Sequence, residues 1–424
     1  MGLSLVRCPF CDRRYNVTGI PPGTKVLCTS CRTVLTVPGN RFVAPPPFWH
    51  RFVPRSGAAQ SACALFGGLI LAAVCFVTLK EVQTSPAVAT APPEAPLPTA
   101  KAIDTASTDL SPLLNVSDNL KSFISEFQRN PRFEIYATEE LKPFVLVGEK
   151  NDKANLPEIF SKFEELLPKL YRTFMKEFGD SLKLERLEVA ELPIVFYTRR
   201  KSYDDWWRGV YRKPPIPEVY GVFSYLERRV SLHYDLTLEA LDSGRTREVL
   251  LHEAVHQLVD HYTRRRKTSD RLGAWWFQEG LGNYFEGYFA TEGELTLTPG
   301  KTTARLPLAR ELVTTRTEDF KPLKQLIVWD VEDIWTEWLA LGSEQEREGQ
   351  LRRLQCAYAE SWALVHFLCH AEDGKYRPFF LDYFKSELEG QGGWEEFNRL
   401  LSRHHPGLDL IQLEEQFKEY IKKL

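Results

Sequence analysis

The chain has 424 residues, of which 43% are hydrophobic and 26% charged. Because this much apolar side chain can bury a core, the composition excludes a chain that is disordered throughout, and the length predicts more than one domain. A formal net charge of −3 excludes polyanion binding by the whole chain through its overall charge. Residues 1–57 differ from the rest, since they hold eight Arg and Lys residues but a single acidic residue, Asp12.

Four cysteines near the N-terminus form two C-x-x-C pairs, made by Cys8 with Cys11 and by Cys28 with Cys31. Each pair brings two thiolates to one metal ion, and two pairs complete a tetrahedral zinc site. The segment resembles the short zinc-ribbon modules found at the N-terminus of many bacterial membrane proteins. We therefore predict a four-cysteine zinc ribbon over residues 1–36 that holds one structural zinc ion. Disulfides, redox-active pairs and bound iron are the alternatives.

Residues 58–79 form an uncharged apolar run that is long enough to cross a hydrocarbon core about 30 Å thick. Arg and Lys are in excess before the run, which predicts that the N-terminus lies inside the cell. We expect a basic juxtamembrane segment at 37–57, one transmembrane helix at 58–79, a Pro-, Ala- and Thr-rich linker at 80–115 and one large domain at 116–424. The ribbon would be cytoplasmic and the large domain periplasmic or extracellular. A buried core helix and a cleaved signal peptide are the alternatives to a membrane span.

The large domain begins with segments of strand character and continues with helices. Apolar runs predict buried strands at 144–147 and 192–197, and helical spacing of apolar residues predicts a helix over 156–178 between them. Two further runs predict a hairpin over 220–233. Beyond Glu248 nearly the whole pattern is helical. This order predicts an α+β fold, with an N-terminal sheet that ends in an edge hairpin and a C-terminal helical part.

The segment Leu251–Leu258, LHEAVHQL, carries the pattern H-E-x-x-H. His252 and His256 are four residues apart on one helix face, so both imidazoles can reach one zinc ion. Glu253 follows the first histidine and is placed to act as a general base on a metal-bound water molecule. The pattern therefore predicts two ligands of a catalytic zinc site, which needs a third.

A second motif, WWFQEGLGNYFEG at Trp275–Gly287, supplies a candidate third ligand. It resembles the third-ligand helix of the gluzincin metallopeptidases, with its Glu-Gly and aromatic positions. The resemblance implies that His252, His256 and Glu279 bind the zinc ion and that Glu253 is the general base. The alternative for Glu279 is a solvent-exposed helix glutamate.

Two residues are candidates to orient a ligand histidine through a hydrogen bond to the ring nitrogen that does not bind zinc. Asn283 stands where some gluzincins carry an Asp with this role, and an Asn supplies less charge. Asp260, which follows His256 by four residues, is the other candidate.

Other candidates lie further along the helical part. Tyr358 is a candidate donor to the oxyanion, because related peptidases often supply such a tyrosine from a downstream helix; a core aromatic is the alternative. His366 and His370 repeat the four-residue spacing without an acidic residue between them, and we interpret them as structural. Cys356 and Cys369 would lie about 20 Å apart on one helix, which predicts free thiols.

The stretch from about Glu248 to Leu368 resembles a bacterial domain family of uncharacterised function within the gluzincin clan. The resemblance implies a zinc peptidase fold. Together with the predicted membrane span, it gives the expectation of a membrane-anchored peptidase that hydrolyses peptide bonds outside the cytoplasm. We expect an endopeptidase, because the hairpin at Gly221–Tyr225 has no acidic residue to hold a substrate amine. The expected partners are the membrane and a peptide or protein substrate, without nucleic acid; the oligomeric state stays open. The alternatives are a non-catalytic, membrane-tethered binding or sensor protein on this fold, and a ribbon that binds nucleic acid or protein.

Overall fold

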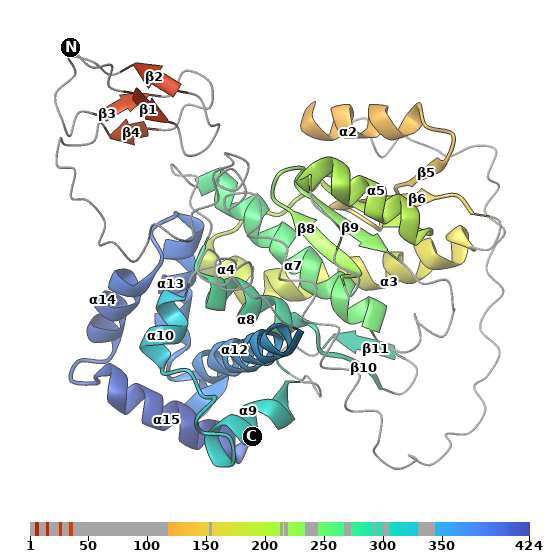
Figure 1. Cartoon of the computed structure of the whole chain (residues 1–424). Coiled ribbons are helices and arrows are strands. Elements are labelled where there is room, and N and C mark those ends of the chain that lie inside the picture. The colour runs from red at the N-terminus through yellow and green to blue at the C-terminus, as the bar shows by residue number, and fades with distance from the viewer. Residues whose placement is uncertain are drawn as a thin grey trace.

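The structure is a computed structural model of the chain (Figure 1). It describes residues 5–7, 14–16, 25–27, 34–36, 118–151, 155–212, 215, 219–233, 245–266, 273–291, 294–297, 300, 305–329 and 344–424. Near the N-terminus, two antiparallel hairpins are described, formed by β1 (Leu5–Arg7) with β2 (Arg14–Asn16) and by β3 (Lys25–Leu27) with β4 (Val34–Thr36). The four ribbon cysteines lie outside the described residues, so the zinc ribbon stays a prediction.

The expected fold class was wrong in one part, the transmembrane helix. Within the described ranges, no helix is both long enough and apolar enough to cross a membrane. The longest of them, α12 (Glu344–His370), begins EQEREGQLRR, and these charged residues exclude it as a span. Residues 58–79 themselves lie outside the described part of the chain. The described fold is α+β with a mixed sheet.

The sheet has five strands in the order β5-β6-β7-β9-β8. The central strands β6, β7 and β9 are parallel, and the edge strands β5 and β8 pair antiparallel to their neighbours. Every residue of β6 and β7 is buried, which explains why both read as continuous apolar runs. The strands are β5 (Phe133–Tyr136), β6 (Phe144–Glu149), β7 (Leu192–Tyr197), β8 (Gly221–Ser224) and β9 (Arg229–His233). The predicted strands and edge hairpin are therefore confirmed.

Helices connect and flank these strands before the helical part begins. The predicted helix over 156–178 is α3, which ends at Phe174 and continues as one π-helical turn. The elements of this part are α2 (Asp118–Gln128), α3 (Leu156–Phe174), η4 (Met175–Gly179), α4 (Asp180–Leu182) and α5 (Arg200–Tyr211).

The rest of the described chain is almost entirely helical, as the sequence pattern predicted. The exception is a small hairpin of β10 (Tyr288–Thr291) with β11 (Glu294–Leu297). The helices are α7 (Arg245–Arg266), α8 (Trp275–Phe285), α9 (Leu306–Thr314), α10 (Leu323–Val328), α12 (Glu344–His370), η5 (Ala371–Gly374), α13 (Arg377–Leu388), α14 (Trp394–His404) and α15 (Leu410–Lys423). Helix α8 lies between α7 and α12 and packs against both (Figure 1).

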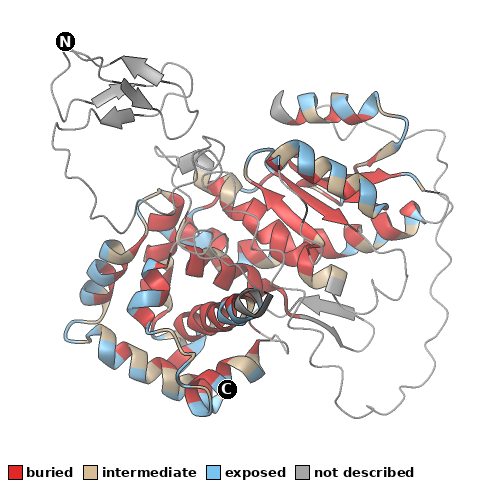
Figure 2. Cartoon of the chain, in the orientation of Figure 1, coloured by how far each residue is buried: buried red, intermediate tan, exposed pale blue. Residues whose placement is uncertain are grey.

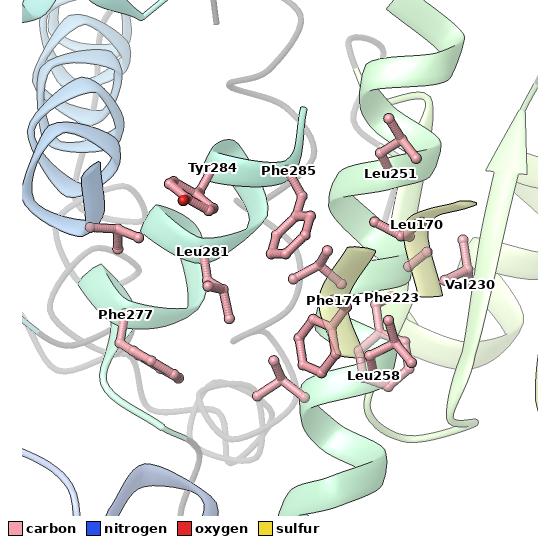
Figure 3. Close-up of a cluster of buried hydrophobic side chains, with 14 of the residues drawn as sticks. Leu170, Phe174, Phe223, Val230, Leu251, Leu258, Phe277, Leu281, Tyr284 and Phe285 are labelled. Carbon is pink, nitrogen blue, oxygen red and sulfur yellow. The ribbon is translucent and has the colours of Figure 1, made fainter. Parts of the chain in front are cut away.

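One apolar core joins the sheet to the helices. Figure 3 shows side chains of α3, the hairpin, α7 and α8 meeting in a single cluster, with Phe174 and Phe285 near its centre. The rings of these two residues lie 5.9 Å apart. Burial is most complete in α7 and α8, whereas α14 and α15 alternate between buried and exposed faces (Figure 2). The two helices that carry the predicted ligands are thus interior helices.

The two cysteines of the helical part are free thiols. Cys356 and Cys369 both lie on α12, both are buried and neither forms a disulfide. Burial raises the pKa of the Cys356 thiol to about 11. Both are therefore protonated core residues at neutral pH, which confirms the interpretation from their spacing.

Candidate metal centre

The two histidines of the H-E-x-x-H pattern lie on the buried middle of α7. Apolar residues fill the positions between the polar ones, so both sides of the helix can pack against the core: Leu250, Leu251, Ala254, Val255, Leu258 and Val259 are all buried. His252 and His256 are 0% exposed, and their ring centroids lie 4.7 Å apart. Four-residue spacing on this helix thus places two imidazoles together in the interior.

Helix α8 brings Glu279 to the same point. Its two carboxylate oxygens lie 3.2 Å from Nε2 of His252 and 3.5 Å from Nε2 of His256. One ligand atom from each of the three residues lies within 4.8 Å of the others. In a tetrahedral site with zinc–ligand bonds of about 2.1 Å, ligand atoms are about 3.4 Å apart. The two distances from Glu279 to the histidines therefore match the spacing of zinc ligands.

Glu253, the candidate base, faces the edge of the sheet. Its Oε2 accepts a hydrogen bond of 2.7 Å from the backbone N–H of Phe223, on edge strand β8. Burial, at 1% exposure, raises the pKa of Glu253 to about 7. This close approach of strand and helix requires a glycine two residues earlier, because a Cβ atom at Gly221 would lie 2.5 Å from the side chain of Val249.

Glu286, which the sequence analysis missed, holds His252, the first candidate ligand. Its Oε1 lies 2.9 Å from Nδ1 of His252. The two ring nitrogens of His252 thus face two carboxylates, Glu286 at Nδ1 and Glu279 at Nε2. With its proton on Nδ1, bonded to Glu286, the ring can bind a metal ion through Nε2. Glu286 follows Glu279 by seven residues and closes the same helix, so helical spacing within the second motif was a signal that could have found it.

Arg305 is a second residue that sequence reasoning missed. Its side chain is buried, at 1% exposure, and a guanidinium nitrogen lies 3.4 Å from Oε1 of Glu286. It precedes α9 and belongs to none of the motifs, so the sequence carried no signal for it.

Neither predicted orienting residue contacts a ligand histidine. The side-chain amide of Asn283 donates instead to the backbone carbonyl of Glu279 at 2.6 Å. Asp260 lies one turn beyond His256 on α7. The negative charge of Asp260 contributes instead to the raised pKa of Tyr225, whose main cause is burial.

Helix α12 places Tyr358 at the site, beside the candidate ligand Glu279. It is fully buried on α12, and its hydroxyl group forms a hydrogen bond with Glu279. Burial raises the pKa of Glu279, while the bonds from His252 and Tyr358 act in the opposite direction. The Tyr358 ring packs edge-on against Trp275 at 5.2 Å, and the guanidinium of Arg305 lies 5.3 Å from its centre.

The second histidine pair of α12 lies apart from this cluster. Nδ1 of His366 lies 2.8 Å from the hydroxyl group of Tyr420, and Nε2 of His370 lies 2.7 Å from that of Tyr284. Burial lowers the pKa of His366 to about 4. These partners agree with a structural role.

The residues present fit a divalent cation. Oε1 of Glu279 and Oε1 of Glu253 are buried without a hydrogen-bond partner among the described residues. Buried polar atoms of this kind normally have partners. When ionised, the carboxylates of Glu253, Glu279 and Glu286 also outnumber the guanidinium of Arg305, and a 2+ charge would balance them. Two imidazoles and one carboxylate are a ligand set that suits zinc.

Comparison with known proteins adds one finding. Residues 248–381 match a family described as a protein of unknown function (DUF1570). The matched range runs from α7 to α13 and contains the histidines, Glu279, Glu286, Arg305 and Tyr358. No curated protein matches the chain. Since the matching family has no known function, the resemblance to gluzincins stays a prediction.

Proposed function

We propose that this chain is a zinc-dependent peptidase whose metal ligands are His252, His256 and Glu279. The observation that carries the proposal is their convergence in the interior, with the carboxylate of Glu253 beside them. A fold alone does not assign an activity, and this proposal rests on the site.

The residues divide the work of peptide hydrolysis. A zinc ion bound by the three ligands would polarise the scissile carbonyl and acidify a water molecule. Glu253, held by Phe223 through one oxygen, has its other oxygen available to accept the proton of the water and pass it to the leaving amine. Tyr358, whose hydroxyl group is next to Glu279, is the proposed donor to the developing oxyanion.

Strand β8 offers a way to align the substrate. It is an edge strand, and the backbone of Phe223 on its outer side faces Glu253. An extended peptide that adds to this edge would pass close to the metal ligands. Residues 221–225 include no acidic side chain to hold a free amine, so we propose cleavage within a chain.

The metal content tests the first part of the proposal. The full-length chain and its Glu279→Ala variant would be loaded with zinc, passed through a desalting column and measured by elemental analysis. We expect the variant to bind one zinc ion fewer per chain, because it loses a ligand. The difference isolates this site from any zinc held elsewhere. Equal zinc contents would contradict a Glu279 ligand.

Activity tests the second part. We expect the zinc-loaded chain to cleave denatured casein, with fragments identified by mass spectrometry. The variant Glu253→Gln should keep its zinc, since Glu253 is not a ligand, and should lose about 10²- to 10⁴-fold in rate through the missing base. A variant that loses zinc together with activity, or that cleaves at the wild-type rate, would refute this role of Glu253.

A second candidate, a non-catalytic protein with a structural zinc, is favoured by one observation. His252, His256 and Glu279 are all 0% exposed, and closed sites are typical of structural zinc. On this reading, removing the zinc lowers the melting temperature, and the loaded wild-type chain and Glu253→Gln both leave casein intact.

A further inference from the structure

Arg305 contacts two groups that each touch a different metal ligand. One guanidinium nitrogen lies 3.4 Å from Oε1 of Glu286, and the same oxygen is 2.9 Å from Nδ1 of His252. The guanidinium carbon lies 5.3 Å from the centre of the Tyr358 ring, and the hydroxyl group of Tyr358 is bonded to Glu279. Two buried chains of contacts, one to a histidine ligand and one to the carboxylate ligand, therefore start at one side chain.

We propose that Arg305 is a positioning residue that sets the affinity of the site for zinc by holding Glu286 and Tyr358 against two of its ligands. The inference rests on the proposed metal site and assigns a role to a residue outside both sequence motifs.

The first contact holds Glu286 in place. A guanidinium nitrogen of Arg305 lies 3.4 Å from Oε1 of Glu286, and that oxygen lies 2.9 Å from Nδ1 of His252. A carboxylate at this position accepts from Nδ1 and makes the opposite nitrogen a better ligand. A guanidinium suits this position because it stays protonated when buried.

The second contact explains why the residue is Arg and not Lys. A planar guanidinium can stack on an aromatic ring while its edge reaches a carboxylate, whereas an ammonium group is a point charge. Arg305 makes both contacts, because its guanidinium carbon lies over the Tyr358 ring and one of its nitrogens lies 3.4 Å from Glu286. A Lys at this position would keep the charge but would lose the planar group that contacts the Tyr358 ring.

The test measures zinc affinity rather than activity. Full-length wild type, Arg305→Gln, Arg305→Lys and Glu286→Gln would compete for zinc with a chelator of known affinity. The site's zinc is defined as the zinc that Glu279→Ala fails to bind. We expect Arg305→Gln and Glu286→Gln to weaken binding about 10- to 100-fold, the range for lost outer partners of a ligand, and Arg305→Lys to fall between them and wild type.

A double variant separates positioning from a general structural role. If Arg305 acts through Glu286, adding Arg305→Gln to Glu286→Gln should weaken zinc binding by less than it does in the wild type. Arg310 is the matched control, because it lies five residues further on α9 with an exposed side chain. Arg310→Gln should leave zinc affinity unchanged.

The outcomes are distinguishable. Wild-type zinc affinity in Arg305→Gln overturns the inference while the metal site stands. If Arg305→Gln does not fold, as judged by circular dichroism, wild-type affinity in Glu286→Gln overturns it equally. If wild type binds no more zinc than Glu279→Ala, the proposed function fails and the inference fails with it.

Discussion

His252 is constrained from three sides. Glu286 holds Nδ1, Glu279 lies at Nε2, and Gly282 of the same helix as Glu279 lies against the ring. A Cβ atom at position 282 would stand 2.8 Å from Cε1 of the imidazole, closer than such atoms normally approach. The ring therefore has one orientation before any metal binds, which is what a preformed site requires.

This geometry predicts the effect of Gly282→Ala. The added methyl group must push His252 away from Glu279 and Glu286, so we expect zinc binding to weaken at least tenfold, as for other disturbed ligands. Overpacking costs about 1–3 kcal/mol, while Ala is favoured over Gly within a helix by about 1 kcal/mol. The free energy of unfolding should therefore fall by about 0–2 kcal/mol. Chelator competition and urea unfolding measure the two effects.

Gly209 provides the control for this substitution. It lies within α5, and a Cβ atom there would meet nothing within 4 Å. Gly209→Ala should raise the free energy of unfolding by up to about 1 kcal/mol and leave zinc binding unchanged. Wild-type zinc affinity in Gly282→Ala would show that the His252 ring can move without loss.

At the scale of elements, α8 is fixed at its start and along its side. The backbone N–H of Ala274, at its N-cap, donates to Oε2 of Glu387 on α13 at 3.0 Å, and Tyr383 donates to the other oxygen at 2.6 Å. Along the side, a Cβ atom at Gly280 would stand 2.5 Å from the backbone oxygen of Ser361 on α12. Helix α8 thus presents Glu279 from a backbone that two other helices position.

The ends of the parallel strands are joined by a buried carboxylate. Glu149, at the end of β6, accepts from Arg132 at 2.6 Å, from Arg199 at 2.8 Å and from Ser202 at 2.6 Å. Arg132 directly precedes β5, whereas Arg199 and Ser202 both lie at the start of α5. Burial would raise the pKa of Glu149, but the hydrogen bonds from Ser202, Arg132 and Arg199 lower it below its ordinary value.

The lowered pKa predicts a pH-dependent contribution to stability. Because the folded-state pKa lies below the unfolded one, the contribution is complete above about pH 4.5 and is lost as the pH falls through the folded-state value. Glu149→Gln should lower the free energy of unfolding at pH 7 by about 1–3 kcal/mol, by weakening a buried, hydrogen-bonded charge. The difference from wild type should shrink below pH 4.5 in urea unfolding.

Glu165→Gln serves as the comparison. Glu165 is partly exposed and pairs with Lys169 one turn away at 2.9 Å, an arrangement that contributes about 0.3–0.5 kcal/mol. If the free energy of unfolding of Glu149→Gln differs from that of wild type by the same amount from pH 7 to pH 3, the charged network is ruled out as the source of the difference.

At the scale of the whole molecule, the site forms where the sheet and the helices meet. The sheet contributes Phe223, whose N–H holds the candidate base, and the helical part contributes Glu279 and Tyr358. Helix α7 carries the remaining residues and belongs to the core of both halves (Figure 3).

Local patterns in the sequence were sufficient to predict the features that depend on residues close together in the chain. Four-residue spacing placed His252 and His256 together, continuous apolar runs located β6 and β7, and strands followed by helices predicted the α+β class. The membrane helix predicted for residues 58–79 lies outside the described residues, among which no helix could cross a membrane.

The sequence by itself thus determined the two histidines, the glutamate beside them and the succession of elements, because helix and strand periods are properties of adjacent residues. Only the tertiary structure decided what surrounds them. Glu286, not Asn283, orients His252, and Arg305 reaches both Glu286 and Tyr358 across α8 and α12. These contacts join residues far apart in the chain, and no local period records which distant side chains the packed core brings together.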